Sequence, residues 1–329
     1  MKYTVIGDGG FGTAIALVLH EREHDVTLWG RDENHLDELR GRRENVRYLK
    51  GVTIPKGIKI VADPDEALAK ASVVVNAVPT QFVRSIFERL AGSVPKKASL
   101  LSLSKGIEVG TLMRPSQILA ELLPRRPTAV LSGPSHAEEV ARRFPASVVV
   151  AAKSHALARK LQTALTTPRF RVYTNVDPTG VELAGALKNI IALAAGVCDG
   201  LGFGDNAKAA LVTRGLVEIG RLAVKLGARR TTFAGLAGMG DLVTTAFSKH
   251  GRNRAVGEKL GQGKSLAEIL HKMNMVAEGV ETTRSTLALA RRHRVDMPIV
   301  REMHEILFEA KSPIDALSAL MTRSTKTEL

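Results

Sequence analysis

The first half of the chain alternates short runs of β-branched residues with stretches of helical periodicity. Several of these runs are apolar at every position, as at 73–75, whereas a strand with one face in water alternates apolar and polar residues. Strands that are apolar on both faces are covered by helices on each side, and right-handed crossovers join them into a parallel sheet. The pattern predicts a doubly wound α/β sheet with strands at 3–6, 25–29, 58–61, 72–77, 99–103, 128–131, 147–152 and 170–174.

A glycine-rich turn joins the first strand to the first helix. Its sequence, residues 7–12, is Gly-Asp-Gly-Gly-Phe-Gly and matches Gly-x-Gly-x-x-Gly. Glycines allow the tight turn and let the backbone approach a pyrophosphate, which binds the N–H groups at the start of the helix. The motif therefore predicts a dinucleotide site. The side chain of Asp8 is expected to point away from it, because a carboxylate and a phosphate repel each other.

The end of the second strand bears on which dinucleotide binds. NAD sites usually place an acidic residue there, about 20 residues after the glycines, on the ribose hydroxyls. Here Arg31 is placed to meet a 2′-phosphate, and Asp32 comes one residue late. Arg31 could also be an ordinary solvated arginine. We expect NADP or NAD as cofactor, with NADPH slightly favoured.

After Asn175 the pattern becomes helical. Asp177-Pro178 is a favourable helix start, since aspartate caps the N-terminus and proline suits the first turn. Glycine-rich connections are expected at 199–204, 235–240 and 261–263. We expect a dinucleotide-binding Rossmann domain at 1–175 and an all-helical substrate and catalytic domain at 176–329.

Lys188 stands in a helix that is otherwise apolar. Residues 181–196 carry only two charges, Glu182 and Lys188. A lysine is rarely buried unless it is paired, and burial lowers its pKa by disfavouring the charged form. Two interpretations stay open: Lys188 meets an anionic group, or it extends its ammonium to water from a half-buried helix.

Polar residues follow three strands and form a further cluster in the helical half. The strand ends 76–79, 104–106 and 132–137 should meet at the carboxyl edge of the sheet, where ligands bind. In the helical half, Asp241 is either a ligand-facing carboxylate or a helix cap. Arg252 and Asn253 are suited to phosphate oxygens and hydroxyls. His136 is expected to be structural and Arg254 to lie on the surface.

The composition excludes several classes of protein. The 329 residues contain one cysteine, so the chain can form no internal disulfide, and a reducing, cytoplasmic location is expected. The formal net charge of +14 favours anionic ligands, but aromatics are only 4% and the arginines are scattered, which argues against nucleic acid. No uninterrupted apolar run approaches the ~18 residues of a membrane span, so no stable membrane insertion is expected.

Together these segments resemble the bacterial-type NAD(P)-dependent sn-glycerol-3-phosphate dehydrogenases over nearly the whole chain. The matching segments are Gly7–Ala14, Ser104–Gly106, Ser132–Ala137, Glu182–Gly204, Gly240–Thr245, Gly251–Arg254 and Val276–Gly279. Gly10 and Gly251 stand where serine is common in that family, so any contact of a serine hydroxyl is lost.

The resemblance implies reversible hydride transfer between NAD(P)H and dihydroxyacetone phosphate, giving sn-glycerol 3-phosphate for glycerophospholipid synthesis. Lys188 would be the general acid and base, assisted by Lys105. The substrate would contact Lys105, Gly133, Ser135, Lys188, Asp241, Gly251, Arg252 and Asn253. The cofactor would contact Gly7, Gly9, Gly10, Phe11, Gly12, Arg31, Lys105, Ala137, Arg252, Val276 and Glu278. No metal is implied, and a homodimer is the usual state of the family.

Two alternatives remain. A β-hydroxyacid dehydrogenase of the same architecture also uses a helix-borne lysine and asparagine, but needs a basic group for a carboxylate in place of the Arg252-Asn253 pair. A non-catalytic NADP-binding sensor would keep the glycine turn and would have no need of Lys188 together with Lys105.

Overall fold

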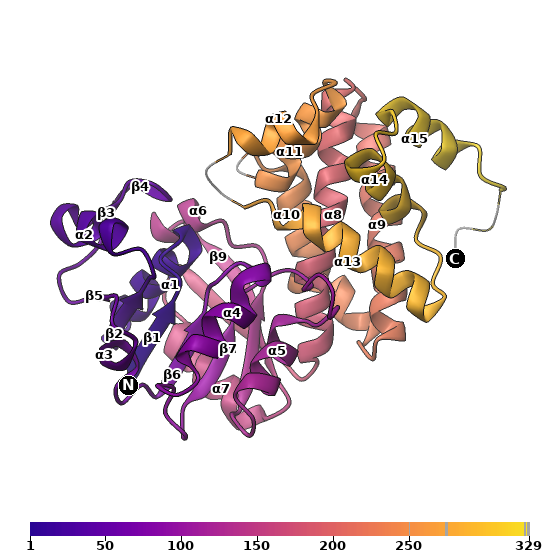
Figure 1. The fold of residues 1–329 in the computed structure, drawn as a ribbon. Coiled ribbons are helices and arrows are strands. Elements are labelled where there is room, and N and C mark those ends of the chain that lie inside the picture. The colour runs from indigo at the N-terminus through magenta and orange to yellow at the C-terminus, as the bar shows by residue number, and fades with distance from the viewer. Residues whose placement is uncertain (250, 274–275, 326, 328–329) are drawn as a thin grey trace.

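A sheet region is followed by a helical region, and the two pack side by side (Figure 1). The structure is a computed structural model that describes residues 1–249, 251–273, 276–325 and 327. The eight strands of the main sheet lie in the order β10-β9-β8-β7-β6-β1-β2-β5. Each predicted strand is present, with its ends within one residue of the prediction: β1 (Lys2–Ile6), β2 (Asp25–Trp29), β5 (Lys59–Val61), β6 (Val73–Asn76), β7 (Ser99–Ser102), β8 (Thr128–Ser132), β9 (Ala146–Ala152) and β10 (Phe170–Asn175).

The doubly wound sheet is confirmed, with one departure from parallel pairing: β9 runs antiparallel to β8. The segment between these strands contains only the five-residue helix α6 (Ala137–Ala141). A parallel crossover usually needs a longer helix that spans the sheet, so this short connection returns the chain in the opposite direction. A small antiparallel pair, β3 (Glu44–Asn45) with β4 (Leu49–Thr53), was also not predicted.

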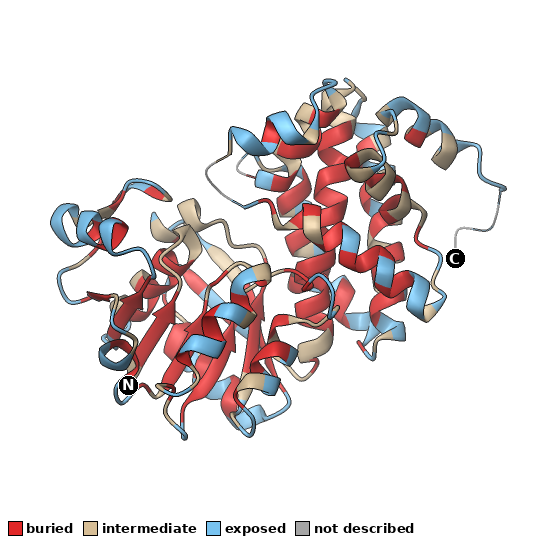
Figure 2. Ribbon diagram, viewed as in Figure 1, coloured by how far each residue is buried: buried red, intermediate tan, exposed pale blue. Residues whose placement is uncertain are grey.

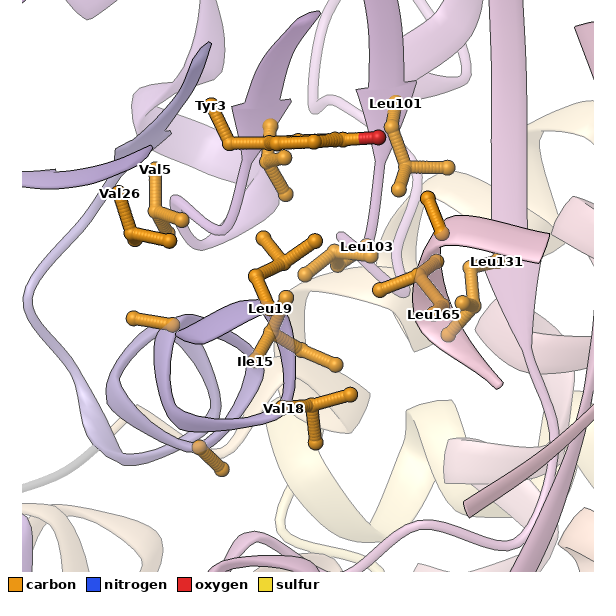
Figure 3. Packing of buried hydrophobic residues seen from close by; sticks show 14 of the residues in the cluster. Tyr3, Val5, Ile15, Val18, Leu19, Val26, Leu101, Leu103, Leu131 and Leu165 are labelled. Carbon is orange, nitrogen blue, oxygen red and sulfur yellow. The ribbon is translucent and has the colours of Figure 1, made fainter. Parts of the chain in front are cut away.

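Helices cover both faces of the sheet, as the apolar strands require. On one face, Ile15 and Leu19 of α1 pack against Tyr3 and Val5 of β1, all fully buried (Figure 3). The helices that contribute to this core are α1 (Gly10–Glu21), α2 (Glu33–Arg42), α6 and α7 (His155–Leu165). The helices of the opposite core are α3 (Pro64–Leu68), α4 (Thr80–Leu90) and α5 (Pro115–Leu122). This packing holds α1, and the glycine turn before it, rigidly against the sheet.

The helical region is built around α8 (Pro178–Gly200), whose residues 180–197 are all buried (Figure 2). As predicted, Pro178 begins it and the Asp177 side chain caps it, accepting from Gly180 N at 2.8 Å. In the described part of the chain α8 alone is long and apolar enough to cross a bilayer, but its apolar window is 100% buried inside the protein, as in a core helix. The surrounding helices are α9 (Asp205–Lys225), α10 (Asp241–Phe247), α11 (Arg252–Gly261), α12 (Leu266–His271), α13 (Glu278–His293), α14 (Pro298–Phe308) and α15 (Pro313–Met321).

One glycine-rich connection is helical instead of open. Residues 236–240 form a π-helical turn that runs directly into α10, so the expected loop before Asp241 is wrong. A 3-10 turn, Arg230–Ala234, precedes it. The π turn packs tightly, because a Cβ at Gly238 would overlap the backbone of Phe233. The π turn therefore fixes the position of Asp241, the first residue of α10.

Helices α8 and α11 pack backbone to backbone through glycines on both. A Cβ at Gly196 or Gly200 would overlap the carbonyl oxygen of a residue in α11, and one at Gly257 or Gly261 would meet a carbonyl oxygen in α8. Each helix thus carries two glycines four residues apart on the face that it shares with the other. Small residues at this spacing allow the closest approach of two helices. The contact sets the position of the N-terminus of α11 beside the middle of α8.

Candidate active site

A cavity of about 480 Å³ runs from the glycine turn to the helical region. The β1–α1 turn and the ends of β2, β6 and β7 line one part, and α8, α10 and the N-termini of α11 and α13 line the other. The three polar strand ends thus meet at one edge of the sheet, as predicted. Ala77, Val78, Ser104, Lys105, Ser135 and His136 from these ends all contribute to the lining.

Two lysines share one carboxylate at the helical end of the cavity. Asp241 Oδ1 lies 2.9 Å from Lys188 Nζ, and Asp241 Oδ2 lies 2.7 Å from Lys105 Nζ. Only 6% of the Lys188 side chain and 3% of that of Asp241 is exposed. The interpretation of Lys188 as a lysine that reaches bulk water is therefore wrong. Its ammonium also donates to the hydroxyl of Thr245.

Burial and charge together set the pKa values of this group. The pKa of Lys188 is lowered to about 8, mainly by burial and also by the nearby Lys105 and Arg252, against the opposing effect of Asp241. Burial alone would raise the pKa of Asp241, but Lys105 and Lys188 outweigh it and keep that pKa below its usual value. Asp241 is therefore ionised, and Lys188 can gain or lose a proton near neutral pH.

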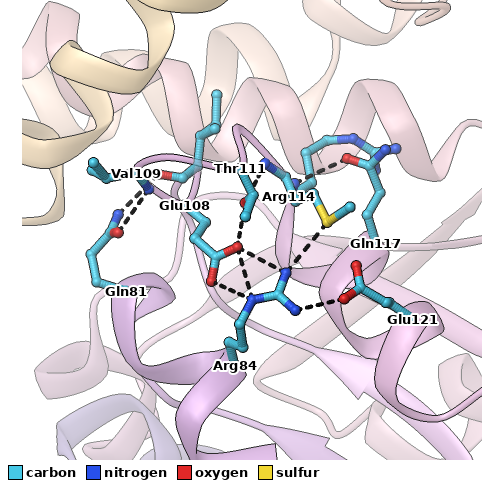
Figure 4. Close-up of polar contacts among 10 residues, drawn as sticks. Gln81, Arg84, Glu108, Val109, Thr111, Arg114, Gln117 and Glu121 are labelled. Carbon is cyan, nitrogen blue, oxygen red and sulfur yellow. Dashed lines mark hydrogen bonds and ion pairs between the residues drawn. The ribbon is translucent and has the colours of Figure 1, made fainter.

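The loop that carries Lys105 is held from both regions of the molecule. Asn189 donates from Nδ2 to the carbonyl oxygen of Lys105 at 2.9 Å. Ile107 is buried in the helical core, and its carbonyl accepts from Gln81 and from Ser285. Further along, Glu108 forms a bidentate ion pair with Arg84 (Figure 4). The position of the Lys105 ammonium is thus fixed by contacts on both sides of the cavity.

The glycine turn at the other end fits a dinucleotide phosphate. A Cβ at Gly9 would meet nothing within 4 Å, so the backbone there is open to the cavity. The first turn of α1 contains no acidic residue. Its N-cap residue is Gly9, and no side chain caps the helix there, which leaves the helix N-terminus free for an anion. A Cβ at Gly10 would lie 2.7 Å from the carbonyl oxygen of Tyr48, so a serine at this position would require the backbone to shift.

The N-terminus of α11 presents Arg252 and Asn253 to the cavity. Asn253 is buried, and its Oδ1 accepts from Gly279 N at 3.0 Å. Arg252 donates to the carbonyl oxygen of Val276 at 3.2 Å. The expectation that Arg254 lies on the surface is wrong, because it forms an ion pair with Asp199 at the end of α8 and only 15% of its side chain is exposed. That pair helps to hold α11 in place.

Most of the predicted site residues lie around this one cavity. Those that line it are Gly7, Gly9, Gly10, Phe11, Gly12, Arg31, Lys105, Ser135, Ala137, Lys188, Asp241, Gly251, Arg252, Asn253, Val276 and Glu278. Gly133 does not, but its carbonyl accepts from Lys105 Nζ at 3.2 Å. Thr245 and Tyr48 were not among the predicted contacts. Thr245 could have been found, since it lies one helical turn after Asp241 and so on the same face.

The fold and the cavity define a class, the two-domain dehydrogenases that bind a nicotinamide dinucleotide at an N-terminal Rossmann sheet. Family models narrow the class: the NAD-dependent glycerol-3-phosphate dehydrogenase N-terminus matches residues 2–158 and the corresponding C-terminus matches 177–318. The chain belongs to this family of oxidoreductases.

Individual members of the family are similar to this chain over nearly their full lengths. The chain is 49% identical over 329 residues to the glycerol-3-phosphate dehydrogenase [NAD(P)+] of Thermoanaerobacter sp. (strain X514), covering 100% of this chain and 99% of that protein. It is 49% identical over 330 residues to the enzyme of that name from Citrifermentans bemidjiense, covering 99% and 98%. The crystal structure of glycerol-3-phosphate dehydrogenase from Coxiella burnetii is similar with a TM-score of 0.95 and 37% identity, covering 98% of this chain and 99% of that one.

Proposed function

We propose that the chain transfers hydride reversibly between NAD(P)H and dihydroxyacetone phosphate, giving sn-glycerol 3-phosphate. The observation that carries the proposal is the pair of ammonium groups, Lys188 and Lys105, held on Asp241 at the end of a dinucleotide-sized cavity. When bound, the reduced nicotinamide supplies the hydride. The residues of the chain supply the proton and the electrostatic stabilisation.

Reduction of a ketone builds negative charge on its oxygen, and cations already in position stabilise that charge as it forms. Lys188 donates the proton to this oxygen, and it takes the proton back in the oxidation direction. Lys105 places a second positive charge beside the same oxygen. Asp241 keeps both ammonium groups oriented and stays ionised throughout, since two cations hold its pKa down.

The remaining contacts are divided between the ends of the cavity. We assign Lys105, Gly133, Ser135, Lys188, Asp241, Gly251, Arg252 and Asn253 to the substrate, with Arg252 on its phosphate. We assign Gly7, Gly9, Gly10, Phe11, Gly12, Arg31, Lys105, Ala137, Arg252, Val276 and Glu278 to the cofactor. A planar guanidinium matches phosphate oxygens in two places, which supports the choice of a phosphorylated substrate over a carboxylate.

The proposal extends to the setting of the enzyme. We propose folding domains at 1–175 and 176–329, since the last strand of the sheet ends at Asn175 and the central helix begins at Pro178. We also propose a cytoplasmic homodimer that supplies glycerol phosphate for membrane lipids. The 49% identity to two glycerol-3-phosphate dehydrogenases [NAD(P)+] over the full chain supports glycerol phosphate as the product.

The choice of substrate is tested by comparing three compounds. We expect rapid oxidation of NADH or NADPH with dihydroxyacetone phosphate and a much lower kcat/KM with dihydroxyacetone, which lacks the phosphate. Arg252→Ala should remove most of this difference by raising the KM for the phosphorylated substrate. A β-hydroxyacid with NAD⁺ or NADP⁺ should not react. Turnover of the β-hydroxyacid alone would favour the rival dehydrogenase, and binding of cofactor without turnover of any compound would favour the sensor.

A further inference from the structure

The carboxylate of Asp8 occupies the space directly over the end of β2. A Cβ at Gly30 would lie 2.5 Å from Asp8 Oδ2 and 2.7 Å from Asp8 Cγ. Glycine at position 30 therefore leaves room for this side chain. Asp8, Gly30 and Arg31 all line the cavity, and 20% of the Asp8 side chain is exposed. The carboxylate of Asp8 thus lies against the end of β2, in the part of the cavity that Gly30 and Arg31 line.

The other carboxylate of this region has a different task. The side chain of Asp32 caps α2, accepting from His35 N at 3.3 Å, and Asp32 does not line the cavity. In NAD sites an acidic residue at the end of the second strand accepts hydrogen bonds from the ribose hydroxyls. In this chain that place is filled by Asp8, which comes from the first turn instead of the second strand.

The surroundings of Asp8 hold it in place. Asn45 donates from Nδ2 to the backbone carbonyl of Asp8 at 2.8 Å and to the hydroxyl of Thr13 at 2.9 Å. His35 Nε2 lies 3.8 Å from Asp8 Oδ2, and only 5% of the His35 side chain is exposed. Burial raises the pKa of the Asp8 carboxyl, with His35 opposing it. A partly desolvated carboxylate beside the cavity repels another anion more strongly than a solvated one does.

We infer that Asp8 is a specificity-determining residue that accepts hydrogen bonds from the adenosine ribose of NADH and repels the 2′-phosphate of NADPH. Arg31, which follows Gly30 directly, carries the opposite charge to Asp8. Asp8 and Arg31 therefore have opposite effects on the binding of a 2′-phosphate. This inference rests on the dinucleotide site proposed above. It modifies the expectation from Arg31 alone, because a carboxylate at the ribose offsets the attraction of the arginine.

The inference is tested by direct binding of two ligands that lack nicotinamide, ADP-ribose and 2′-phospho-ADP-ribose, measured by calorimetry. Asp8→Asn should shift the ratio of the two Kd values at least about tenfold towards the 2′-phosphorylated ligand, since a hydrogen bond to a charged group is replaced and a repulsion is removed. Arg31→Ala should shift the ratio in the opposite direction. Glu33→Gln is the matched control, because Glu33 is exposed on α2 and pairs with Arg40 outside the cavity.

The outcomes separate this inference from the proposed function. If Asp8→Asn changes both Kd values by the same factor, or changes neither, Asp8 is a purely structural residue and the inference is wrong. If neither ligand binds the wild-type chain, the dinucleotide site itself is wrong and the inference falls with it. Asp8→Ser serves if the asparagine variant does not fold. The single tryptophan, Trp29, lines the cavity, so its fluorescence can measure the Kd values of NADH and NADPH. The ratio of these two Kd values should shift in each variant as it does for the two ADP-ribose ligands.

Discussion

At the level of single residues, the site contains a buried group of charges in which Lys188 and Lys105 both pair with Asp241. Lys188 is buried on an apolar helix, and its ammonium is stable there because Asp241 pairs with it and the Thr245 hydroxyl accepts a hydrogen bond from it. Asp241 raises the pKa of Lys188, and the second cation, Lys105, opposes this effect. A buried ion pair with an extra cation therefore keeps a lysine that can exchange its proton near neutral pH.

The pKa of Lys188 predicts the pH dependence of both directions. Below pH of about 8 Lys188 is protonated and can act as an acid, so kcat for ketone reduction should be high there and fall as pH rises through this value. Oxidation of glycerol 3-phosphate needs the neutral amine, so its kcat should rise through the same range. Initial rates from pH 6 to 10 measure both limbs. Two limbs that move in the same direction would contradict the assignment.

Among the elements, the contact between α8 and α11 determines where the substrate groups stand. Arg252 and Asn253 begin α11, and Lys188 and Asn189 lie in the middle of α8. The four glycines that bring these helices together thus fix the distance between Arg252, which we propose binds the phosphate, and Lys188, the proposed proton donor. Side chains of ordinary size would push the two helices apart and enlarge the site.

We predict that Gly257→Ala destabilises the protein and weakens substrate binding. The added Cβ would overlap the carbonyl oxygen of Leu193, and overpacking of this kind costs about 1–3 kcal/mol. Thermal unfolding should show a lower Tm, and the KM for dihydroxyacetone phosphate should rise. Gly41→Ala is the control: Gly41 lies within α2 with nothing near its missing Cβ, so alanine should stabilise by about 0.5–1 kcal/mol. Equal effects of the two substitutions would contradict this account.

Local patterns predicted the elements of this fold better than their pairing. The apolar runs located all eight strands of the main sheet, and Asp177-Pro178 located the start of α8, because these depend on nearby residues. The direction of β9 and the π turn before Asp241 depend on packing between distant segments, and no local pattern predicted them. The same holds in the site: Lys188 and Asp241 were each singled out from their local sequence, but their ion pair was not predicted. Lys105 and Asp241, which also pair, are 136 residues apart.

Across the whole molecule, a few buried polar contacts join the sheet region to the helical region. Glu182 of α8 accepts from Ser116 N at 2.8 Å and forms an ion pair with Arg114 beside α5. Glu278 at the start of α13 accepts from Thr80 N at 2.7 Å. The bond from Asn189 to Lys105 also joins the two regions, and Glu278, Asn189 and Lys105 line the cavity. The relative position of the two regions is therefore coupled to the geometry of the site.

We predict that Glu182→Gln loosens the two regions from each other. Only 1% of the Glu182 side chain is exposed, and breaking a buried ion pair costs about 3–5 kcal/mol because the remaining charge stays buried. Calorimetry should show a lower Tm and a separation of the unfolding of the two regions. Lys59→Met is the control, since the Lys59–Asp25 pair is exposed and worth less than about 1 kcal/mol. An unchanged single transition in Glu182→Gln would argue against the coupling.

The central claim, that Lys188 is the proton donor, is tested most directly by following absorbance at 340 nm with dihydroxyacetone phosphate and NADH or NADPH in Lys188→Met. Its control is Lys208→Met, because Lys208 is also buried and ion-paired, with Asp199, but does not line the cavity. We predict that kcat falls about 10²–10⁴-fold in Lys188→Met, with cofactor binding retained, and changes little in Lys208→Met. A folded Lys188→Met protein with nearly wild-type kcat would contradict the account.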